Sequence, residues 1–403
     1  MFALAALALI AAACHPGTSQ SGHGKSIPSE PWRLPAPVDA SLADLSVTPS
    51  NELLLSWVQP GSGDDQALML SRYASGRWTP VVTVAHSTWF GNAMDTPHVR
   101  MTADGTLWAQ WLGRNTNGSG HARDVLLSRS LDGGRNWSQP VNVNTDGTAT
   151  EHGFTALWPA SRDRLGIAWL DGRATIASGS TMLRATSFGT RLDRGDEAVV
   201  DVSTCDCCRT NAAMTTSGPI LAYRGRTAAE VRDIMVARLD TGRWSTPANV
   251  HADGWVLKGC PMNGPAIAAK DDAVAVAWYT GIGDVQALRV AYSLDGGRKF
   301  GAPVELSRNP RLQGRASTAL IGNGTWVTWL DDESGAAVLK LARIDFNARN
   351  PAIESMTLHT LAGRDRGAGY SRLAAADGKL YVLWSDVAAD RPVLAGAVVS
   401  PKD

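Results

Sequence analysis

The sequence predicts an all-β fold, a β-propeller built from four-stranded blades. Three observations predict it. A short alternating strand that ends in an aromatic residue occurs seven times, at intervals of 51 to 58 residues. Signals for further strands fill the intervals, so that each repeat describes a propeller blade. The chain also begins with a fourth-strand signal that precedes any blade, whereas the last repeat lacks one. We therefore expect seven blades closed by the N-terminal strand, with a six-bladed ring and one aberrant repeat as the alternative.

The second strand of each blade is the clearest element, because it combines alternating apolar residues with a bulky terminal ring. The seven copies end at Trp57, Trp111, Trp169, Tyr223, Trp278, Trp329 and Trp384. A turn such as 103–105 often precedes a copy, and a further strand precedes that turn. This pattern indicates a β-hairpin, which supplies the first and second strands of a blade.

The third and fourth strands follow each copy. Segments such as Val125–Ser128 predict the third strand, and Trp-x-x-Pro-[VA] segments such as the one that begins at Trp137 predict the fourth. Trp32–Val38 resembles this fourth-strand type, while the last repeat stops after its third strand, Val393–Val399. The N-terminal strand can therefore complete the last blade and remove its free edge. We expect one propeller domain over residues 31–400.

The N-terminus predicts export. Residues 1–13 form an apolar run that is shorter than the ~20 residues needed to span a bilayer but suits a signal peptide. Small residues just before Cys14 resemble a bacterial lipoprotein processing site, which implies lipidation of Cys14; a secretory signal with an incidental cysteine is the alternative. Residues 14–30 are rich in Ser, Gly and Pro and predict a flexible tether. We expect a cell-envelope lipoprotein, on the periplasmic side or at the cell surface, that meets the membrane only through its lipid.

The charge balance argues against two classes of partner. The chain has 38 Lys and Arg against 38 Asp and Glu, so no net field attracts nucleic acid or an anionic membrane surface. Charged residues make up 19% and hydrophobic residues 44% of the chain, which disfavours disorder and a coiled coil. We expect a globular monomer that binds no nucleic acid.

Residues that can bind a ligand gather in the segments that enter the inner strands of the predicted blades. In a propeller these segments surround the mouth of the central channel, where ligand sites collect. The ligand-binding candidates in these segments are Arg100, Arg209, Arg315, Arg372, His98 and His152. Guanidinium groups match carboxylates in geometry and charge, so the arginines favour an acidic ligand.

Four cysteines lie at the entrances of two consecutive blades. They are Cys205, Cys207, Cys208 and Cys260. Because the two segments enter their blades at equivalent positions, we expect the four side chains to form one cluster. Three chemistries stay open: two disulfides, as an oxidising envelope favours; a soft-metal site for copper or zinc, with Met262 or His152 as a further ligand; or a redox-active thiol pair. Apart from such a metal we expect no cofactor.

Two turns between third and fourth strands carry the same motif. Ser130–Trp137 and Ser293–Phe300 both fit S-x-D-x-G-x-x-[WF], which resembles the Asp-box, or BNR repeat, of sialidase-like propellers. In such a turn the Asp accepts backbone N–H groups, a Gly takes the positive φ and the aromatic ring packs into the blade. The resemblance implies a sialidase-like propeller architecture, and fold alone does not establish chemistry.

The resemblance also implies a set of site residues. Sialidases bind a substrate carboxylate with three arginines, and they use a Tyr nucleophile polarised by a Glu together with an Asp acid. Arg209, Arg315 and Tyr370 occur in the family's order, and Arg100 would replace its first arginine. The catalytic candidates are Tyr370, Glu151 as the carboxylate that polarises it, and Asp95 as the acid.

These observations predict a ligand-binding module first. Its channel mouth would bind an acidic glycan or another small ligand beside the Cys-rich site. The alternative is an exo-acting glycoside hydrolase of the sialidase type, an exo-α-sialidase. The two differ in one requirement, because hydrolysis also needs Tyr370 and a carboxylate within hydrogen-bond reach of each other.

Overall fold

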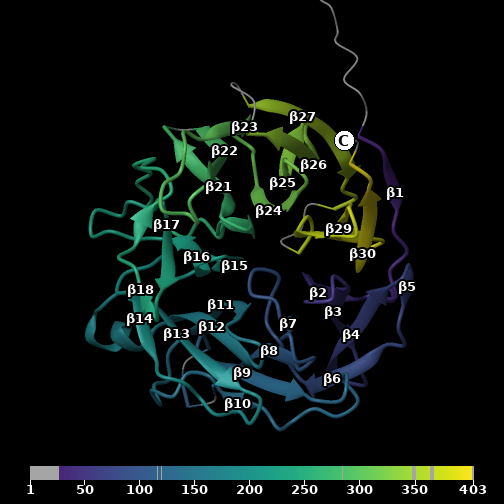
Figure 1. Ribbon diagram of the computed structural model, residues 1–403, viewed down its shortest axis with the longest axis vertical. Helices are drawn as coiled ribbons and strands as arrows, with labels where there is room; N and C mark the ends of the chain where they lie inside the picture. Colours follow the sequence, from purple (N-terminus) through teal and green to yellow (C-terminus); the bar gives the residue numbers. More distant parts are fainter. Residues whose placement is uncertain are drawn as a thin grey trace, which may run out of the picture.

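The computed structural model describes residues 27–115, 117–118, 120–283, 285–346, 351–363 and 367–401. The predicted signal peptide, the predicted lipidation site Cys14 and most of the predicted tether lie outside these residues. The described residues form seven antiparallel sheets, which are arranged as blades around a central axis (Figure 1). The predicted seven-bladed β-propeller is confirmed, and the six-bladed alternative is wrong.

The first four blades contain the strands β2 to β19, which follow one another in chain order. The first blade contains β2 (Ser41–Val47), β3 (Leu53–Pro60), β4 (Gln66–Ala74), β5 (Arg77–Trp78) and β6 (Val82–Ser87). The second contains β7 (His98–Met101), β8 (Leu107–Arg114), β9 (Arg123–Ser130) and β10 (Val141–Asn142). The third contains β11 (His152–Pro159), β12 (Arg164–Asp171), β13 (Met182–Gly189) and β14 (Ala198–Asp201). The fourth contains β15 (Asn211–Thr215), β16 (Gly218–Arg224), β17 (Ile234–Asp240), β18 (Arg243–Trp244) and β19 (Ala248–Asn249).

The remaining three blades repeat the same order from the channel outward. The fifth contains β20 (Ala266–Lys270), β21 (Ala273–Ile282), β22 (Val285–Ser293) and β23 (Val304–Arg308). The sixth contains β24 (Gly314–Ile321), β25 (Gly324–Glu333), β26 (Ala336–Asp345) and β27 (Ala352–Thr360). The seventh contains β28 (Ser371–Ala376), β29 (Lys379–Ala388), β30 (Arg391–Val399) and β1 (Ser29–Pro31).

The core lies between neighbouring blades. The first strand of each blade contacts the first strand of the next, from β2 round to β28 and back to β2, so the inner strands close a ring. Seven apolar clusters fill the seven boundaries between blades. All seven aromatic residues that mark the repeat are buried. Burial of these large rings explains the periodic pattern in the sequence.

The N-terminal strand closes the ring, as predicted, but it lies earlier in the chain than expected. β1 pairs antiparallel with β30, so both ends of the propeller share one blade (Figure 1). The expected strand, Trp32–Val38, forms no strand, although the Trp32 amide donates a hydrogen bond to the Gly396 carbonyl at 2.8 Å. Two prolines in this segment explain the difference, because proline has no N–H group to donate to a neighbouring strand. The first strand therefore begins at Ser29, two residues before the expected domain boundary.

Both Asp-box turns have the geometry that their motif predicts. Asp132 Oδ1 accepts the backbone amide of Asn136 at 2.9 Å, and Asp295 Oδ1 accepts that of Lys299 at 2.9 Å. The amide and side-chain hydrogen bonds of Asn136 lower the pKa of Asp132 to about 2. These turns join the third and fourth strands of their blades, so they serve the architecture and lie outside the channel-mouth segments.

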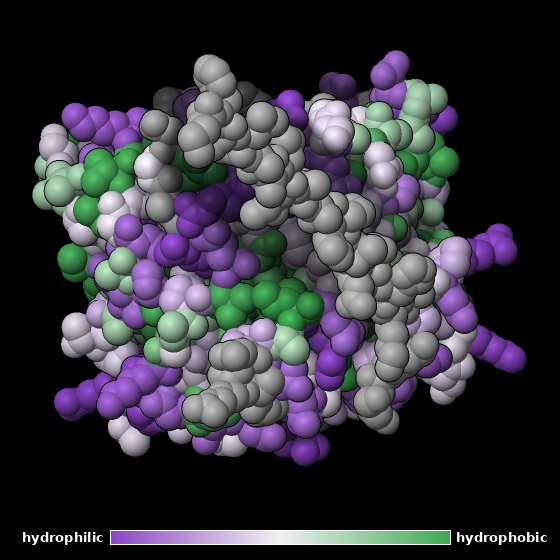
Figure 2. Space-filling model, turned by 90° about the horizontal axis from the view of Figure 1, so that it is seen from above, coloured by the Kyte–Doolittle hydropathy of each residue, from purple (hydrophilic) through white to green (hydrophobic). Residues whose placement is uncertain are grey.

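The edge of the ring has a mixed surface. Hydrophilic and hydrophobic residues are interspersed over the part of this edge that Figure 2 shows in colour. The described residues contain no helix that is both long enough and apolar enough to span a bilayer. The segment η1 (Arg173–Ala177) is a short 3-10 helix between β12 and β13.

Candidate functional site

The segments that enter the inner strands meet around a cavity. This cavity has a volume of about 400 Å³ and is lined by residues of the segments 92–94, 261–263 and 312–315 and by Gly367 and Tyr370. These segments precede or begin the inner strands β7, β20, β24 and β28. Four blades therefore contribute to one cavity at the mouth of the channel, and its role as a ligand site stays a prediction.

Tyr370 lines this cavity, and two arginines contact its ring. Its ring centre is 5.6 Å from Arg209 Cζ and 4.5 Å from Arg315 Cζ, within the range of a cation–π contact. The Tyr370 amide donates to Ser385 Oγ at 3.2 Å, which ties the residue to the neighbouring strand β29. The structure thus brings together Arg209, Arg315 and Tyr370, the three residues that occur in the chain in the same order as in sialidases.

A β-bulge presents Arg315 to the ring of Tyr370. The register of β24 against β25 shifts within the first residues of β24, and Arg315 has a φ of +55°, which is uncommon for a non-glycine residue. The Arg315 amide donates to Asn263 Oδ1 at 2.8 Å, and its guanidinium donates to the Ala368 carbonyl. Contacts from the fifth and seventh blades therefore hold the bulged residue in place.

Arg209 is partly buried, and no ion pair balances its charge among the described residues. Its guanidinium donates only to the backbone carbonyls of Ala93 and Met94, at 3.3 and 3.4 Å. Burial, followed by repulsion from Arg372, lowers the pKa of Arg209 to about 9. An anion beside Arg209 would offset both the burial of its charge and the repulsion from Arg372, because it would supply a hydrogen-bonding partner of opposite charge.

Asp44, which the sequence analysis did not single out, gathers three of the predicted ligand-binding residues. Its buried carboxylate accepts from Arg100 Nη1 at 2.6 Å and from Arg372 Nε at 2.9 Å, and His98 Nδ1 lies 2.9 Å away. Burial opposes ionisation, but Arg100, His98 and Arg372 together hold the pKa of Asp44 well below its usual range. Arg372 also donates to Thr96 Oγ1 at 3.0 Å. In this structure these three side chains are engaged with Asp44 rather than with the open cavity.

Asp95 directly follows the two carbonyls that hold Arg209. Its Oδ2 accepts the Phe154 amide at 2.6 Å, whereas its buried Oδ1 has no hydrogen-bond partner among the described residues. Burial raises the pKa of Asp95 to about 7, and the charge of Glu151 adds to this rise. A carboxyl group with a pKa near neutrality has the property that a general acid needs.

Glu151 and His152 do not join Tyr370. Glu151 precedes β11, which is not a neighbour of β28 in the ring, and among the described residues no carboxylate forms a hydrogen bond with the Tyr370 hydroxyl. His152 is buried, with Nδ1 2.8 Å from the Arg123 carbonyl and Nε2 3.2 Å from Asp146 Oδ1. The predicted pairing of Glu151 with Tyr370 is therefore not formed, and His152 belongs to a separate polar cluster.

The four cysteines form one cluster, as expected from their positions. Cys207 and Cys260 form a disulfide that joins the entrances of the fourth and fifth blades, with Cα atoms 6.1 Å apart. Cys205 and Cys208 are buried thiols. One disulfide is present rather than two, and a metal site with three thiolates is not available in this form because the Cys207 sulfur is already bonded. Met262, which was expected as a further metal ligand, lines the cavity.

Two further charged residues shape the site. Asp44 lies in the inner strand β2, and the fully buried Arg224 ends β16 directly after the marker residue Tyr223. Arg224 Nη2 and Nε donate to the Asn263 carbonyl at 2.8 and 3.0 Å, which fixes the segment that supports Arg315. A single charged residue in a strand that carries no other charge is the sequence signal that identifies both.

Comparison with known proteins extends the fold assignment. No protein family and no curated protein matches this chain. A protein of unknown function from Dyadobacter fermentans has 15% identity and a TM-score of 0.52, over 91% of this chain and 95% of that one. The endosialidase of phage phi92 has 10% identity and a TM-score of 0.52, over 91% of this chain and 68% of that one. A Hadza microbial sialidase, Hz136, has 16% identity and a TM-score of 0.43, over 79% and 66% of the two chains. At such identities the two matches with a TM-score of 0.52 show the fold alone, a β-propeller.

Proposed function

We propose that the channel mouth binds an acidic ligand, of which an acidic glycan is the expected class, and that Arg209 provides the main charged contact. The observation that carries the proposal is Arg209 itself. Its guanidinium lines a small pocket that adjoins the cavity and shares Asn263 and Tyr370 with it. It has no ion pair among the described residues and is close enough to Arg372 for repulsion to lower its pKa. A carboxylate in the cavity would form charge-assisted hydrogen bonds there.

The rest of the cavity suits a sugar. Its volume of about 400 Å³ falls within the range of small-molecule sites, roughly 300–1,000 Å³. The ring of Tyr370 and the side chain of Met262 provide apolar surface, while Asn263 and Arg315 provide polar groups beside it. The phage phi92 protein, which shares the fold, is named an endosialidase, and sialic acid is an acidic sugar; this supports the choice of class.

Titration calorimetry with N-acetylneuraminic acid, glucuronic acid and glucose tests the proposal. We expect the two acids to bind more tightly than glucose, and Arg209→Met to weaken binding of the acids about 10-fold to 100-fold, because a hydrogen bond to a charged group contributes about 1.5–3 kcal/mol. Arg298→Met, at an exposed position of the second Asp-box turn, is the control and should leave binding unchanged. Equal binding of acids and glucose, or equal effects of the two variants, would contradict the proposal.

A specific observation also supports the second candidate, exo-acting hydrolysis of the sialidase type. Asp95 has a pKa of about 7 and an unpartnered carboxyl oxygen, as an acid catalyst would. Against it, Arg100 and Arg372 are bound to Asp44, and the Tyr370 hydroxyl lacks a carboxylate partner among the described residues. We therefore place binding first.

A fluorogenic sialoside assay decides between the two candidates. If the protein is a hydrolase, wild type turns over the substrate, Tyr370→Phe does not, and kcat/KM falls as the pH rises through about 7, because Asp95 must be protonated to donate. Tyr370→Phe keeps the ring between the two arginines, so it tests the hydroxyl alone. Absence of turnover by the wild type would rule out this reaction and leave the binding function.

The proposed setting of this function is the cell envelope. It rests on the apolar run of residues 1–13 and on Cys14 as the lipidated residue. The tether would then hold the propeller away from the membrane, with its channel mouth free to meet a ligand.

A further inference from the structure

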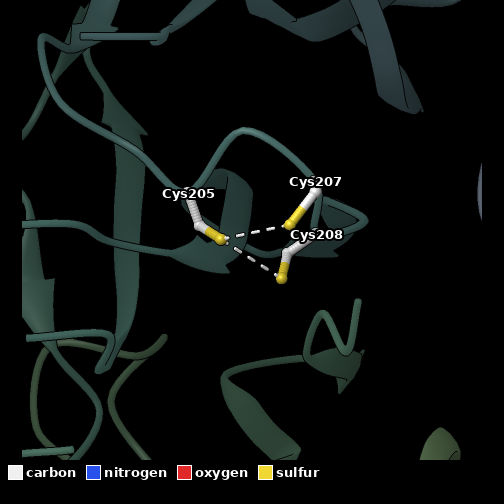
Figure 3. Close-up of side chains that lie close together, drawn as sticks. All are labelled: Cys205, Cys207 and Cys208. Atoms are coloured by element: carbon white, nitrogen blue, oxygen red, sulfur yellow. Dashed lines mark hydrogen bonds between the residues drawn. The ribbon is translucent and has the colours of Figure 1, made fainter. Parts of the chain in front are cut away.

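The sulfur cluster places a buried thiol beside a disulfide. Cys205 Sγ lies 3.7 Å from Cys207 Sγ and 3.4 Å from Cys208 Sγ (Figure 3). The Cys207 sulfur is bonded to Cys260, which is exposed, whereas Cys205 and Cys208 are each 1% exposed. Among the described residues, Cys205 is therefore the thiol that contacts both a disulfide sulfur and a second thiol.

Two buried arginines favour the thiolate form of Cys205. Arg232 Nη1 donates to Cys205 Sγ at 3.1 Å. Arg224 is also buried and donates only to backbone carbonyls, so its positive charge is not paired among the described residues. The hydrogen bond with Cys208, followed by the backbone hydrogen bond of Cys207 and the charges of these arginines, lowers the pKa of Cys205 to about 6. Burial raises the pKa of Cys208 well above its usual value, so the two thiols have different chemistry.

We propose that the four cysteines form a thiol–disulfide exchange centre in which Cys205 attacks the Cys207–Cys260 disulfide. The thiolate of Cys205 forms a bond to Cys207 Sγ, the bond between Cys207 and Cys260 breaks, and its electron pair leaves on Cys260. The Cys260 thiolate then takes up a proton from solvent at its exposed position. One disulfide and two thiols are present before and after this step, so it requires no external oxidant or reductant.

Cys208 completes the exchange. Its sulfur attacks Cys205 in the new Cys205–Cys207 bond, forms a Cys205–Cys208 disulfide, and releases Cys207, which takes the proton that Cys208 gives up. In sum, the buried thiol pair loses two electrons and two protons, and the disulfide at the rim gains them. Because Cys208 has a raised pKa, its step should be the slower one, and the Cys205–Cys207 intermediate should accumulate first.

The exchange would release a covalent tie at the edge of the ligand cavity. Cys207 and Cys260 connect the segment that carries Arg209 to the segment that carries Met262 and Asn263, and these three residues line the small pocket that adjoins the ligand cavity. Rearrangement would therefore free one wall of the cavity to move. This consequence rests on the proposed function, whereas the exchange itself does not.

Trapping the rearranged form with a maleimide tests the exchange in the native, full-length protein without added reductant. We expect the maleimide to label Cys260 in the wild type, and peptide mapping of the labelled protein to show Cys205 bonded to Cys207 or to Cys208. The labelling rate should rise as the pH passes through about 6, where Cys205 ionises, and then level off. Mapping also separates any label on Cys14 from these products.

Two variants separate the steps. Cys205→Ser removes the nucleophile, so Cys260 labelling should fall at least 10-fold, whereas Cys208→Ser should still label at Cys260 and yield only the Cys205–Cys207 bond. Three results would overturn the proposal: label on Cys205 or Cys208 with the original disulfide intact, no label at Cys260 in wild type after hours, or equal labelling of Cys260 in Cys205→Ser. If a variant fails to fold, the disulfide map of the wild type still decides. Ligand affinity does not enter this test.

Discussion

Replacement of Asp44 by Asn is expected to lower the free energy of unfolding by about 3–5 kcal/mol at pH 7, the usual cost of breaking a buried ion pair. The change removes the negative charge that balances Arg100 and Arg372 and leaves both guanidiniums with a neutral acceptor. The side chain of Asp44 is 3% exposed, so water cannot reach this position to solvate the two guanidinium groups. Denaturant unfolding followed by circular dichroism measures the effect.

The effect should depend on pH. In the folded protein the pKa of Asp44 lies well below the value of about 3.9 that applies in an unfolded chain. Its ionised form therefore contributes fully to stability above about pH 4, and the contribution is lost as the pH falls through the folded-state pKa. Asp65→Asn is the matched control, because it breaks an Asp–His pair at the surface, where such pairs contribute little. A cost for Asp44→Asn no larger than that of the control would show that Asp44 does not organise the cluster.

The blades could be predicted because one physical requirement recurs. Each second strand ends in a large ring that fills the space between two blades, and the sequence shows that requirement as a period. The first strand could not be placed in the same way. Trp32–Val38 has the composition of an outer strand, but its prolines cannot donate hydrogen bonds to a neighbouring strand. Ser29–Pro31 pairs with β30 instead.

The position of the site could also be predicted, but its internal pairing could not. Arg209, Arg315 and Tyr370 converge because each lies at the entrance of an inner strand. Asp44, in contrast, is 54 residues from His98 and 328 residues from Arg372 in the chain, and no local pattern connects them. Only the closed ring brings these residues together, and it thereby places three predicted ligand-binding residues, His98, Arg100 and Arg372, in contact with Asp44.

For the cysteines, too, the position could be predicted from the sequence and the pairing could not. Equivalent positions at two blade entrances were enough to predict that the four side chains meet. Their pairing depends on which side chain of the triplet reaches across the blade boundary, and the spacing in the sequence does not decide that. In the structure Cys207 reaches Cys260, while Cys205 and Cys208 are buried and Cys205 contacts Arg232.

Replacement of Trp32 by Ala is expected to lower the free energy of unfolding by about 3–5 kcal/mol, as large-to-small changes of buried aromatic residues do. Trp32 follows β1 and is 6% exposed. Its ring packs against Tyr73 and Trp78 of the first blade and against Tyr381 of the seventh, with ring centres 4.9 to 5.5 Å apart. The residue therefore joins the two blades at which the ring closes, and no other contact of the N-terminal segment buries a side chain of that size among the described residues.

The loss of stability in Trp32→Ala should begin in the seventh blade, where β1 closes the ring. Without the Trp32 ring, β1 has only three residues paired with β30, too few to hold an edge strand in place. Amide hydrogen exchange in β30 should therefore accelerate under conditions in which the other blades remain protected. Trp137→Ala, in the first Asp-box turn, is the control: its ring is partly buried but does not link the ends of the chain, so exchange in β30 should keep its wild-type rate. Equal stability losses in the two variants, together with unchanged exchange in β30 for Trp32→Ala, would mean that the strand pairing of β1 closes the propeller without this residue.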